Sequence, residues 1–164
     1  MKIKDFAIPA FIMILVLLLA YLWLAPSGQP PAPEVNFTDI HGNQFTLSDL
    51  KGRPVIINFW ATECPGCVNE IPLLIESYKK YQSNGLLIIG VAMAYDPESQ
   101  VKEMVRQKNM RYPIVLDTQE VLGKAFSIKV TPTTLFIDKD GNIHKRKLGE
   151  ILHTELETTI HDLL

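Results

Sequence analysis

The two cysteines of the chain, Cys64 and Cys67, are its strongest candidates for chemistry. They are the only cysteines in 164 residues, they are separated by two residues, and they follow the apolar segment Val55 to Ile57. A thiol pair with this spacing after a strand is typical of a dithiol redox centre. We therefore expect the pair to exchange a disulfide with a partner.

The elements around the cysteines give the two thiols different roles. The apolar run from Pro54 to Trp60 predicts a buried strand, and the spacing of apolar residues after Cys64 predicts a helix that ends at Gly85. Cys64 then lies at a helix N-terminus, where unpaired N–H groups favour a thiolate. We predict that Cys64 is the nucleophile and that Cys67 resolves the mixed disulfide that Cys64 forms.

Other uses of a cysteine pair fit this sequence less well. A zinc site needs about four ligands, and the four histidines form no pair at short spacing. Haem attachment needs histidine where Val68 stands, and a peroxidatic cysteine motif needs threonine where Ala61 stands. An inert disulfide closing only about four residues would stabilise the chain little. We predict no metal and no cofactor. Two alternatives stay open, namely a binding, chaperone or metal-delivery module with incidental cysteines and a peroxide reductase.

The remaining pattern predicts an α/β fold. Strands are predicted at residues 35–38, 44–47, 54–60, 86–94, 112–116, 133–137 and 143–148. Helices are predicted at residues 64–84, 96–108 and 119–126 and at the C-terminus. Asp96 is the expected cap of one helix, and Thr154 with Glu157 forms the expected capping box of the last. This order predicts parallel strands followed by an antiparallel pair, in a sheet with helices on both faces.

The first 34 residues are predicted to hold this domain at a membrane. Phe6 to Ala25 contains no charged residue and is long enough to cross a hydrocarbon core of about 30 Å. Lys2 and Lys4 precede it, so the N-terminus is expected in the cytoplasm. A cleaved signal peptide is the alternative, and it too exports the domain.

The predicted organisation therefore has three parts. Residues 1–25 form a cytoplasmic N-terminus and a transmembrane anchor, residues 26–34 form a proline-rich linker, and residues 35–164 form the folded domain. That domain is expected on the extracytoplasmic side of the membrane. The formal net charge is −2 and the basic residues are scattered, so no nucleic-acid partner is expected.

The residues around the cysteines resemble a known family. The stretch Asn58-Phe59-Trp60-Ala61-Thr62-x-Cys64-Pro65-x-Cys67-x-x-Glu70-x-Pro72 is similar to the signature of membrane-anchored thioredoxin-like proteins of the TlpA/ResA/CcmG type. These proteins are bacterial thiol-disulfide oxidoreductases. The segment from Val130 to Asp138 resembles the second signature of the same family, which contains a cis-proline loop. The resemblance covers about residues 35–164 and implies a thioredoxin-like fold with an N-terminal β-hairpin extension.

The resemblance also implies roles and partners. Pro132 corresponds to the cis-proline beside the cysteines, and with Thr131 and Trp60 it completes the predicted substrate-binding residues. Glu70 corresponds to a glutamate that helps to move protons during exchange. The implied substrates are disulfides in exported proteins, such as apocytochrome c, and the implied electron donor is a membrane dithiol protein. The implied location is a bacterial inner membrane, with the catalytic domain on its periplasmic or extracytoplasmic side.

Two positions depart from the family pattern. Glu63 stands where the family usually has tryptophan, so a charge replaces an apolar contact surface. A carboxylate beside Cys64 disfavours the thiolate and favours a reducing couple. Asn58 stands where cytoplasmic thioredoxins carry a buried aspartate that accepts a proton. Because asparagine does not titrate, that role is expected to pass to Glu70, to water or to the substrate.

Overall fold

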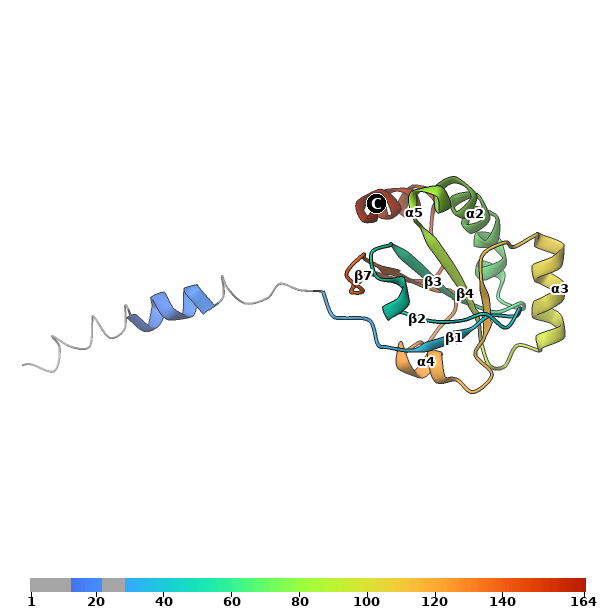
Figure 1. Ribbon diagram of the computed structural model, residues 1–164, viewed down its shortest axis with the longest axis horizontal. Helices are drawn as coiled ribbons and strands as arrows, with labels where there is room; N and C mark the ends of the chain where they lie inside the picture. Colours follow the sequence, from blue (N-terminus) through green and yellow to red (C-terminus); the bar gives the residue numbers. More distant parts are fainter. Residues whose placement is uncertain (1–12, 22–28) are drawn as a thin grey trace, which may run out of the picture.

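The computed structural model describes residues 13–21 and 29–164 (Figure 1). Residues 13–21 are helical, and the rest of the predicted anchor lies outside the described residues. Among the helices formed by these two ranges, none combines the length and the apolar character that crossing a bilayer requires.

The domain is built on a mixed five-stranded sheet with the strand order β5-β4-β3-β6-β7 (Figure 1). Three strands run parallel, namely β3 (Val55–Trp60), β4 (Leu87–Ala92) and β5 (Ile114–Leu116). Two more continue the sheet antiparallel, namely β6 (Thr133–Ile137) and β7 (Ile143–Leu148). The predicted change from parallel to antiparallel pairing is confirmed.

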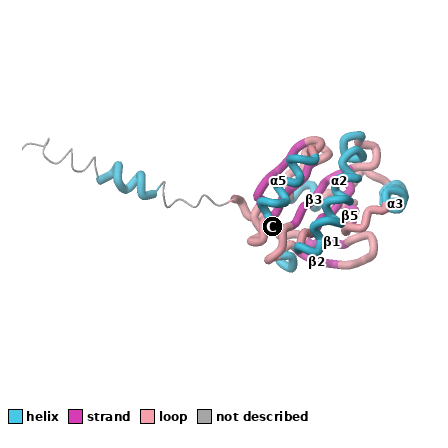
Figure 2. Tube along the Cα trace, turned by 90° about the horizontal axis from the view of Figure 1, so that it is seen from above, coloured by secondary structure: helices cyan, strands magenta, loops and turns pink. Residues whose placement is uncertain are grey.

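Both faces of the sheet are covered (Figures 1 and 2). One face packs with three helices, α2 (Pro65–Tyr81), α3 (Glu98–Lys108) and α5 (His153–Leu163). The other packs with β1 (Asn36–Thr38), β2 (Gln44–Thr46) and α4 (Val121–Ala125). Two short 3₁₀ helices complete the fold, η1 (Ser48–Leu50) and η2 (Gln82–Asn84). Because both faces are covered, every residue of β3 and β4 is buried, which explains why both sequences are apolar except for Asn58.

The N-terminal hairpin forms as predicted. β1 and β2 pair antiparallel, with Phe37 opposite Phe45 and their ring centroids 5.2 Å apart. Phe37 is fully buried against the sheet face that also packs with α4. The hairpin is therefore a cover for that face of the sheet.

The second half of the predicted linker packs on the domain. Ala32 N donates a hydrogen bond to Gly141 O at 2.9 Å, and Ile143 N donates to Pro30 O at 2.9 Å. Residues 30–32 thus pair with the turn between β6 and β7 and are part of the folded domain. The prediction of a spacer over all of residues 26–34 is wrong for this part, because backbone pairing with a distant turn leaves no local signal.

The start of α3 differs from the prediction. The helix begins at Glu98 with Pro97 as its N-cap residue, and the side chain of Asp96 makes no cap. Asp96 instead accepts hydrogen bonds from Thr62. The helix predicted at residues 119–126 is also shorter, since α4 spans only Val121–Ala125.

The predicted capping box of α5 is also wrong. The helix begins at His153, so Thr154 lies inside its first turn, and no side chain caps it. The carboxylate of Glu157 accepts from Lys80 Nζ at 2.6 Å and from Tyr81 Oη at 2.7 Å. The side chain of Glu157, which the sequence predicted to cap the start of α5, therefore binds two residues of α2 instead.

Gly90 is a glycine in the middle of a buried strand, and its neighbours explain it. A Cβ at this position would lie 2.8 Å from Ile114 Cδ1 and 3.2 Å from Trp60 Nε1. We expect Gly90→Ala to lower the free energy of unfolding by about 1–3 kcal/mol, because an added methyl overpacks a filled core. Urea denaturation of the oxidised chain measures this, and an unchanged midpoint would contradict the close packing at Gly90.

Candidate active site

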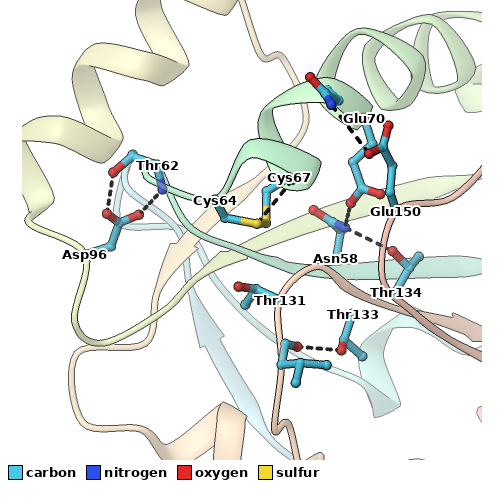
Figure 3. The surroundings of a disulfide bond; sticks show 12 residues. Asn58, Thr62, Cys64, Cys67, Glu70, Asp96, Thr131, Thr133, Thr134 and Glu150 are labelled. Carbon is cyan, nitrogen blue, oxygen red and sulfur yellow. Dashed lines mark hydrogen bonds between the residues drawn. A yellow bond between two sulfur atoms is a disulfide. The ribbon is translucent and has the colours of Figure 1, made fainter.

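Cys64 and Cys67 form a disulfide at the start of α2 (Figure 3). Cys64 is the N-cap residue of the helix, and its sulfur accepts a hydrogen bond from Cys67 N at 3.2 Å. Cys64 is partly exposed, whereas Cys67 is fully buried. A partner can therefore reach the sulfur of Cys64 first, which supports its predicted role as nucleophile and that of Cys67 as the resolving thiol.

The cis-proline loop lies against the turn between the cysteines. The peptide bond between Thr131 and Pro132 is cis, as the resemblance implied. Pro132 Cδ lies 3.6 Å from the position that a Cβ on Gly66 would occupy. Pro132 is buried, and Thr131 is partly exposed, with Oγ1 3.5 Å from Tyr95 Oη. The structure thus brings both predicted substrate-binding residues of this loop to the cysteine pair.

Trp60 does not lie on this surface. Its side chain is 1% exposed and belongs to the core shared with α2 and α5. The prediction that Trp60 contacts the substrate is wrong, because it is the last residue of a central strand covered on both faces. Its role is to pack beneath the site.

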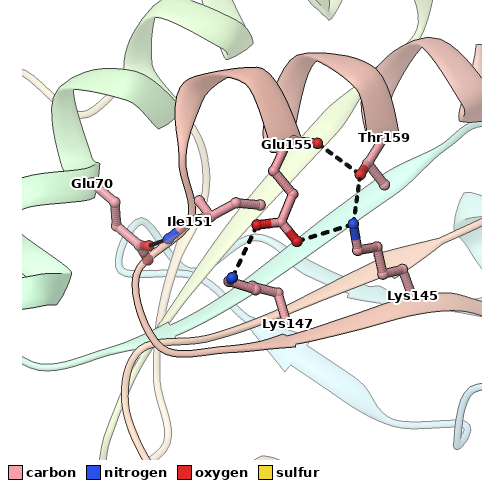
Figure 4. A network of polar contacts seen from close by, with 6 residues as sticks. All are labelled: Glu70, Lys145, Lys147, Ile151, Glu155 and Thr159. Atoms are coloured by element: carbon pink, nitrogen blue, oxygen red, sulfur yellow. Dashed lines mark hydrogen bonds and ion pairs between the residues drawn. The ribbon is translucent and has the colours of Figure 1, made fainter.

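Glu70 is buried one helical turn after Cys67 on the same helix. Its side chain is 2% exposed, although glutamate is rarely buried without a partner. Oε1 accepts a hydrogen bond from Asn58 Nδ2 at 2.5 Å, and Oε2 accepts one from Ile151 N at 3.2 Å (Figures 3 and 4). Asn58 Nδ2 also donates to Thr134 Oγ1 at 3.0 Å. Residues from β3, β6 and the segment before α5 therefore surround this one carboxyl group of α2.

Burial raises the pKa of Glu70 from its ordinary value of 4.5 to about 7. The hydrogen bonds from Ile151 and Asn58 act in the opposite direction, because they favour the ionised form. A carboxyl group whose pKa lies near neutrality both gains and loses a proton easily under physiological conditions. This is the property that a proton-handling role requires of Glu70.

A basic residue near Glu70 has its own partner (Figure 4). Lys147 Nζ lies 2.9 Å from Glu155 Oε2, and Lys145 Nζ lies 3.0 Å from the other oxygen of the same carboxylate. The positive charge of Lys147 lowers the pKa of Glu70, but it does so less than either hydrogen bond does. Burial therefore outweighs the nearby charge in setting the proton affinity of Glu70.

Asp96 fixes the turn that precedes Cys64, and the sequence did not predict this contact. Its Oδ2 accepts from Thr62 N at 2.7 Å and its Oδ1 accepts from Thr62 Oγ1 at 2.5 Å (Figure 3). Thr62 follows β3, and Asp96 follows the neighbouring strand β4. The carboxyl ends of adjacent parallel strands meet at one sheet edge, which is the one sequence-level signal that could have suggested this pair.

Other parts of the described chain offer less chemistry. In residues 13–21 and 29–164, histidine, cysteine and acidic side chains form no group of three that could hold a metal ion. A groove of about 910 Å³ lies between α3 and the hairpin loop, and its lining includes Asp39, His41 and Arg111 but neither cysteine. The reactive chemistry therefore belongs to the start of α2.

A disulfide at the start of a helix, beside a cis-proline and above a buried carboxyl group, defines a thiol-disulfide oxidoreductase with a thioredoxin-like fold. The chain belongs to the AhpC/TSA family, whose profile matches residues 29–146.

Relatives agree with this assignment. The chain is 36% identical over 126 residues to thiol-disulfide oxidoreductase ResA of Bacillus cereus, across 77% of this chain and 72% of the relative. It is 33% identical over 133 residues to ResA of Bacillus subtilis (strain 168), across 81% and 72% of the two chains. The crystal structure of a thiol:disulfide interchange protein from Chlorobium tepidum TLS matches with a TM-score of 0.77 and 29% identity, over 85% of this chain and 99% of that one. The protein is thus a protein-disulfide oxidoreductase.

The raised pKa of Glu70 predicts how stability depends on pH. The folded state holds the proton of Glu70 more tightly than the unfolded chain does, so stability falls as the pH rises from 4.5 to about 7. Below this window both states are protonated, and the penalty is absent. We expect the contribution of Glu70 to the free energy of unfolding to fall by roughly 3 kcal/mol across the window.

Urea denaturation of the oxidised chain at several pH values measures this pH dependence of the free energy of unfolding. Glu70→Gln should remove most of the fall, because glutamine does not titrate. Glu76→Gln is the matched control, since Glu76 is exposed on the same helix. If Glu70→Gln and Glu76→Gln follow the same curve against pH, Glu70 is not the buried titrating group.

Proposed function

We propose that the protein is a membrane-anchored oxidoreductase that reduces disulfides in exported proteins on the extracytoplasmic side of a bacterial inner membrane. The observation that carries the proposal is the partly exposed Cys64 above a buried Cys67 and a buried Glu70. The charge-free stretch Phe6 to Ala25 supports the anchor, and its orientation is supported by Lys2 and Lys4 before it and by the absence of basic residues from residues 26–33 after it.

The reaction begins with both cysteines reduced. The thiolate of Cys64 attacks one sulfur of the substrate disulfide, and the other substrate sulfur leaves as a thiolate and takes up a proton. The thiolate of Cys67 then attacks the sulfur of Cys64, which releases the second substrate thiolate and forms the Cys64 to Cys67 disulfide seen in the structure. Two electrons pass to the substrate, and a dithiol donor must return them.

Glu70 is placed to take part in the second step. Cys67 must lose a proton before it can attack, and Glu70 lies one helical turn away on the same buried side of α2. With a pKa of about 7, Glu70 can accept that proton directly or through water. Asn58 cannot titrate, and its amide instead holds the carboxyl group of Glu70 in place.

The surroundings of Cys64 favour the reducing direction. Pro65 and Gly66 between the cysteines carry no positive charge, and Glu63 adds a carboxylate directly before the nucleophile. Strong oxidants of this class stabilise the reduced thiolate, and a nearby negative charge does the opposite. Apocytochrome c, whose cysteines must be reduced before haem attachment, is the proposed substrate, and a membrane dithiol protein is the proposed donor.

Insulin reduction tests the activity. The full chain should accelerate the precipitation of insulin by dithiothreitol, and Cys64→Ser should abolish the acceleration because it removes the nucleophile. Cys67→Ala should instead accumulate a mixed disulfide through Cys64, visible on a non-reducing gel, because the resolving thiol is gone. An unsubstituted chain that gives no acceleration would contradict the proposal.

Thiol labelling tests the location. In intact spheroplasts, a maleimide that does not cross membranes should label Cys64 of the Cys67→Ala variant, because Cys64 is partly exposed and is proposed to face outward. Labelling only after the cells are lysed would place the domain in the cytoplasm and contradict the proposal.

A further inference from the structure

The reaction at Cys64 dictates where a substrate chain must lie. A mixed disulfide joins two sulfurs at about 2.05 Å, so the residues next to the substrate cysteine must cover the surface around Cys64. Two exposed carboxylates, those of Glu63 and Glu150, lie on this surface.

Glu63 lies on one side of the disulfide, at the edge of a groove. The groove has a volume of about 440 Å³ and runs between the turn before Cys64 and α3. Its lining consists of Thr62, Glu63, Ser99, Gln100, Glu103, Met104 and Gln107, and none of these is basic. Met104 offers an apolar wall, and the side-chain oxygens of Glu63 and Gln100 offer acceptors. This combination suits a long side chain with methylene groups and a positive end.

The second acidic residue of the groove is already paired. Glu103 accepts from Arg106 Nη2 at 2.6 Å and from Gln107 Nε2 at 2.7 Å. Arg106 therefore balances the charge of Glu103, and Glu63 supplies the negative charge of the groove next to Cys64.

Glu150 lies on the other side of the disulfide. Its Oε2 is 3.5 Å from the position that a Cβ on Gly66 would occupy and 3.4 Å from Asn69 Nδ2. Gly66 stands between the two cysteines, so this carboxylate lies beside the turn that carries them. Figure 3 shows Glu150 and the pair of Thr62 and Asp96 on opposite sides of the disulfide.

Few basic residues are available to balance the negative charges of Glu63 and Glu150. Lys147 forms an ion pair with Glu155. The cis-proline loop contributes Lys129, which is exposed and lies three residues before Pro132. Asp96 adds a further carboxylate beside Thr62.

We propose that Glu63 and Glu150 determine substrate specificity by favouring disulfides whose cysteine is flanked by lysine or arginine. The flanking basic side chain lies in the groove beside Glu63 or next to Glu150 while the substrate sulfur is bonded to Cys64. The inference rests on the proposed disulfide reductase function and names the class of polypeptide that it acts on. Complementary charges around an interface act mainly on the rate of encounter and on partner choice. We therefore expect Glu63 and Glu150 to change the rate at which Cys64 attacks the substrate disulfide.

Three peptides with one intramolecular disulfide test the proposal. They differ only in the two residues before the first cysteine, which are lysine, glutamine or glutamate. The pre-reduced full chain is mixed with each peptide, and the rate is divided by that of dithiothreitol with the same peptide. This division removes differences in the intrinsic reactivity of the peptides. We expect a normalised rate about tenfold higher for the lysine peptide than for the glutamate peptide at low salt, and a smaller ratio at high salt.

The variants separate selection from reactivity. Glu63→Gln and Glu150→Gln should each lower the lysine-to-glutamate ratio by about threefold, whereas Glu76→Gln should leave the ratio unchanged. Glu63→Gln also alters the charge next to Cys64, but that effect is common to all peptides and cancels in the ratio.

The outcomes are distinct. Equal normalised rates for all three peptides, or a ratio that neither variant lowers, would overturn the specificity assignment while leaving the reductase function intact. Failure of the chain to reduce any of the peptides, the glutamine peptide included, would overturn the reductase function and the specificity assignment with it.

Discussion

The antiparallel pairing of β3 with β6 is the constraint on which the site depends. Phe59 lies opposite Thr133, so the end of β3 lies beside the start of β6. The residues that follow β3 include the two cysteines, and the residues that precede β6 include the cis-proline. One strand register therefore brings together two segments that are distant in the sequence. A shift by one residue would turn every side chain of β6 to the opposite face and separate them.

The same pairing builds the polar interior under the cysteines. Asn58 of β3 lies opposite Thr134 of β6, and the amide of Asn58 reaches both Thr134 and Glu70. A buried carboxyl group is costly unless its oxygens find donors, and Glu70 finds two, from Asn58 and from the backbone of Ile151. These bonds make the burial tolerable without fully cancelling its effect, so the proton affinity of Glu70 stays raised. The sheet register thus sets the proton chemistry of the site as well as its shape.

The carboxylates around the disulfide are of two kinds, one buried and two exposed to solvent. This difference in exposure decides which groups each of them can influence. Glu70 is buried, so its protonation depends on the low-dielectric interior and on the groups that contact its carboxyl oxygens. Glu63 and Glu150 are exposed, so solvent screens them, and their influence extends mainly to charged groups that approach the surface. Asn58 contacts the buried carboxylate, and Glu63 directly precedes the nucleophile.

The sequence by itself determined the features that repeat along one element. Apolar runs and helical spacing located β3, β4, α2 and both hairpins, because burial of a strand or helix face imposes a period on that segment alone. The spacing of Cys64 and Cys67 indicated the chemistry, and the resemblance indicated Glu70 and Pro132. Only the tertiary structure decided the partners of side chains across elements. It paired Asp96 with Thr62 and Glu157 with Lys80 in place of helix caps, buried Trp60, and joined residues 30–32 to the domain. These outcomes depend on strand register and on distances between elements, which leave no trace in the local pattern of residues.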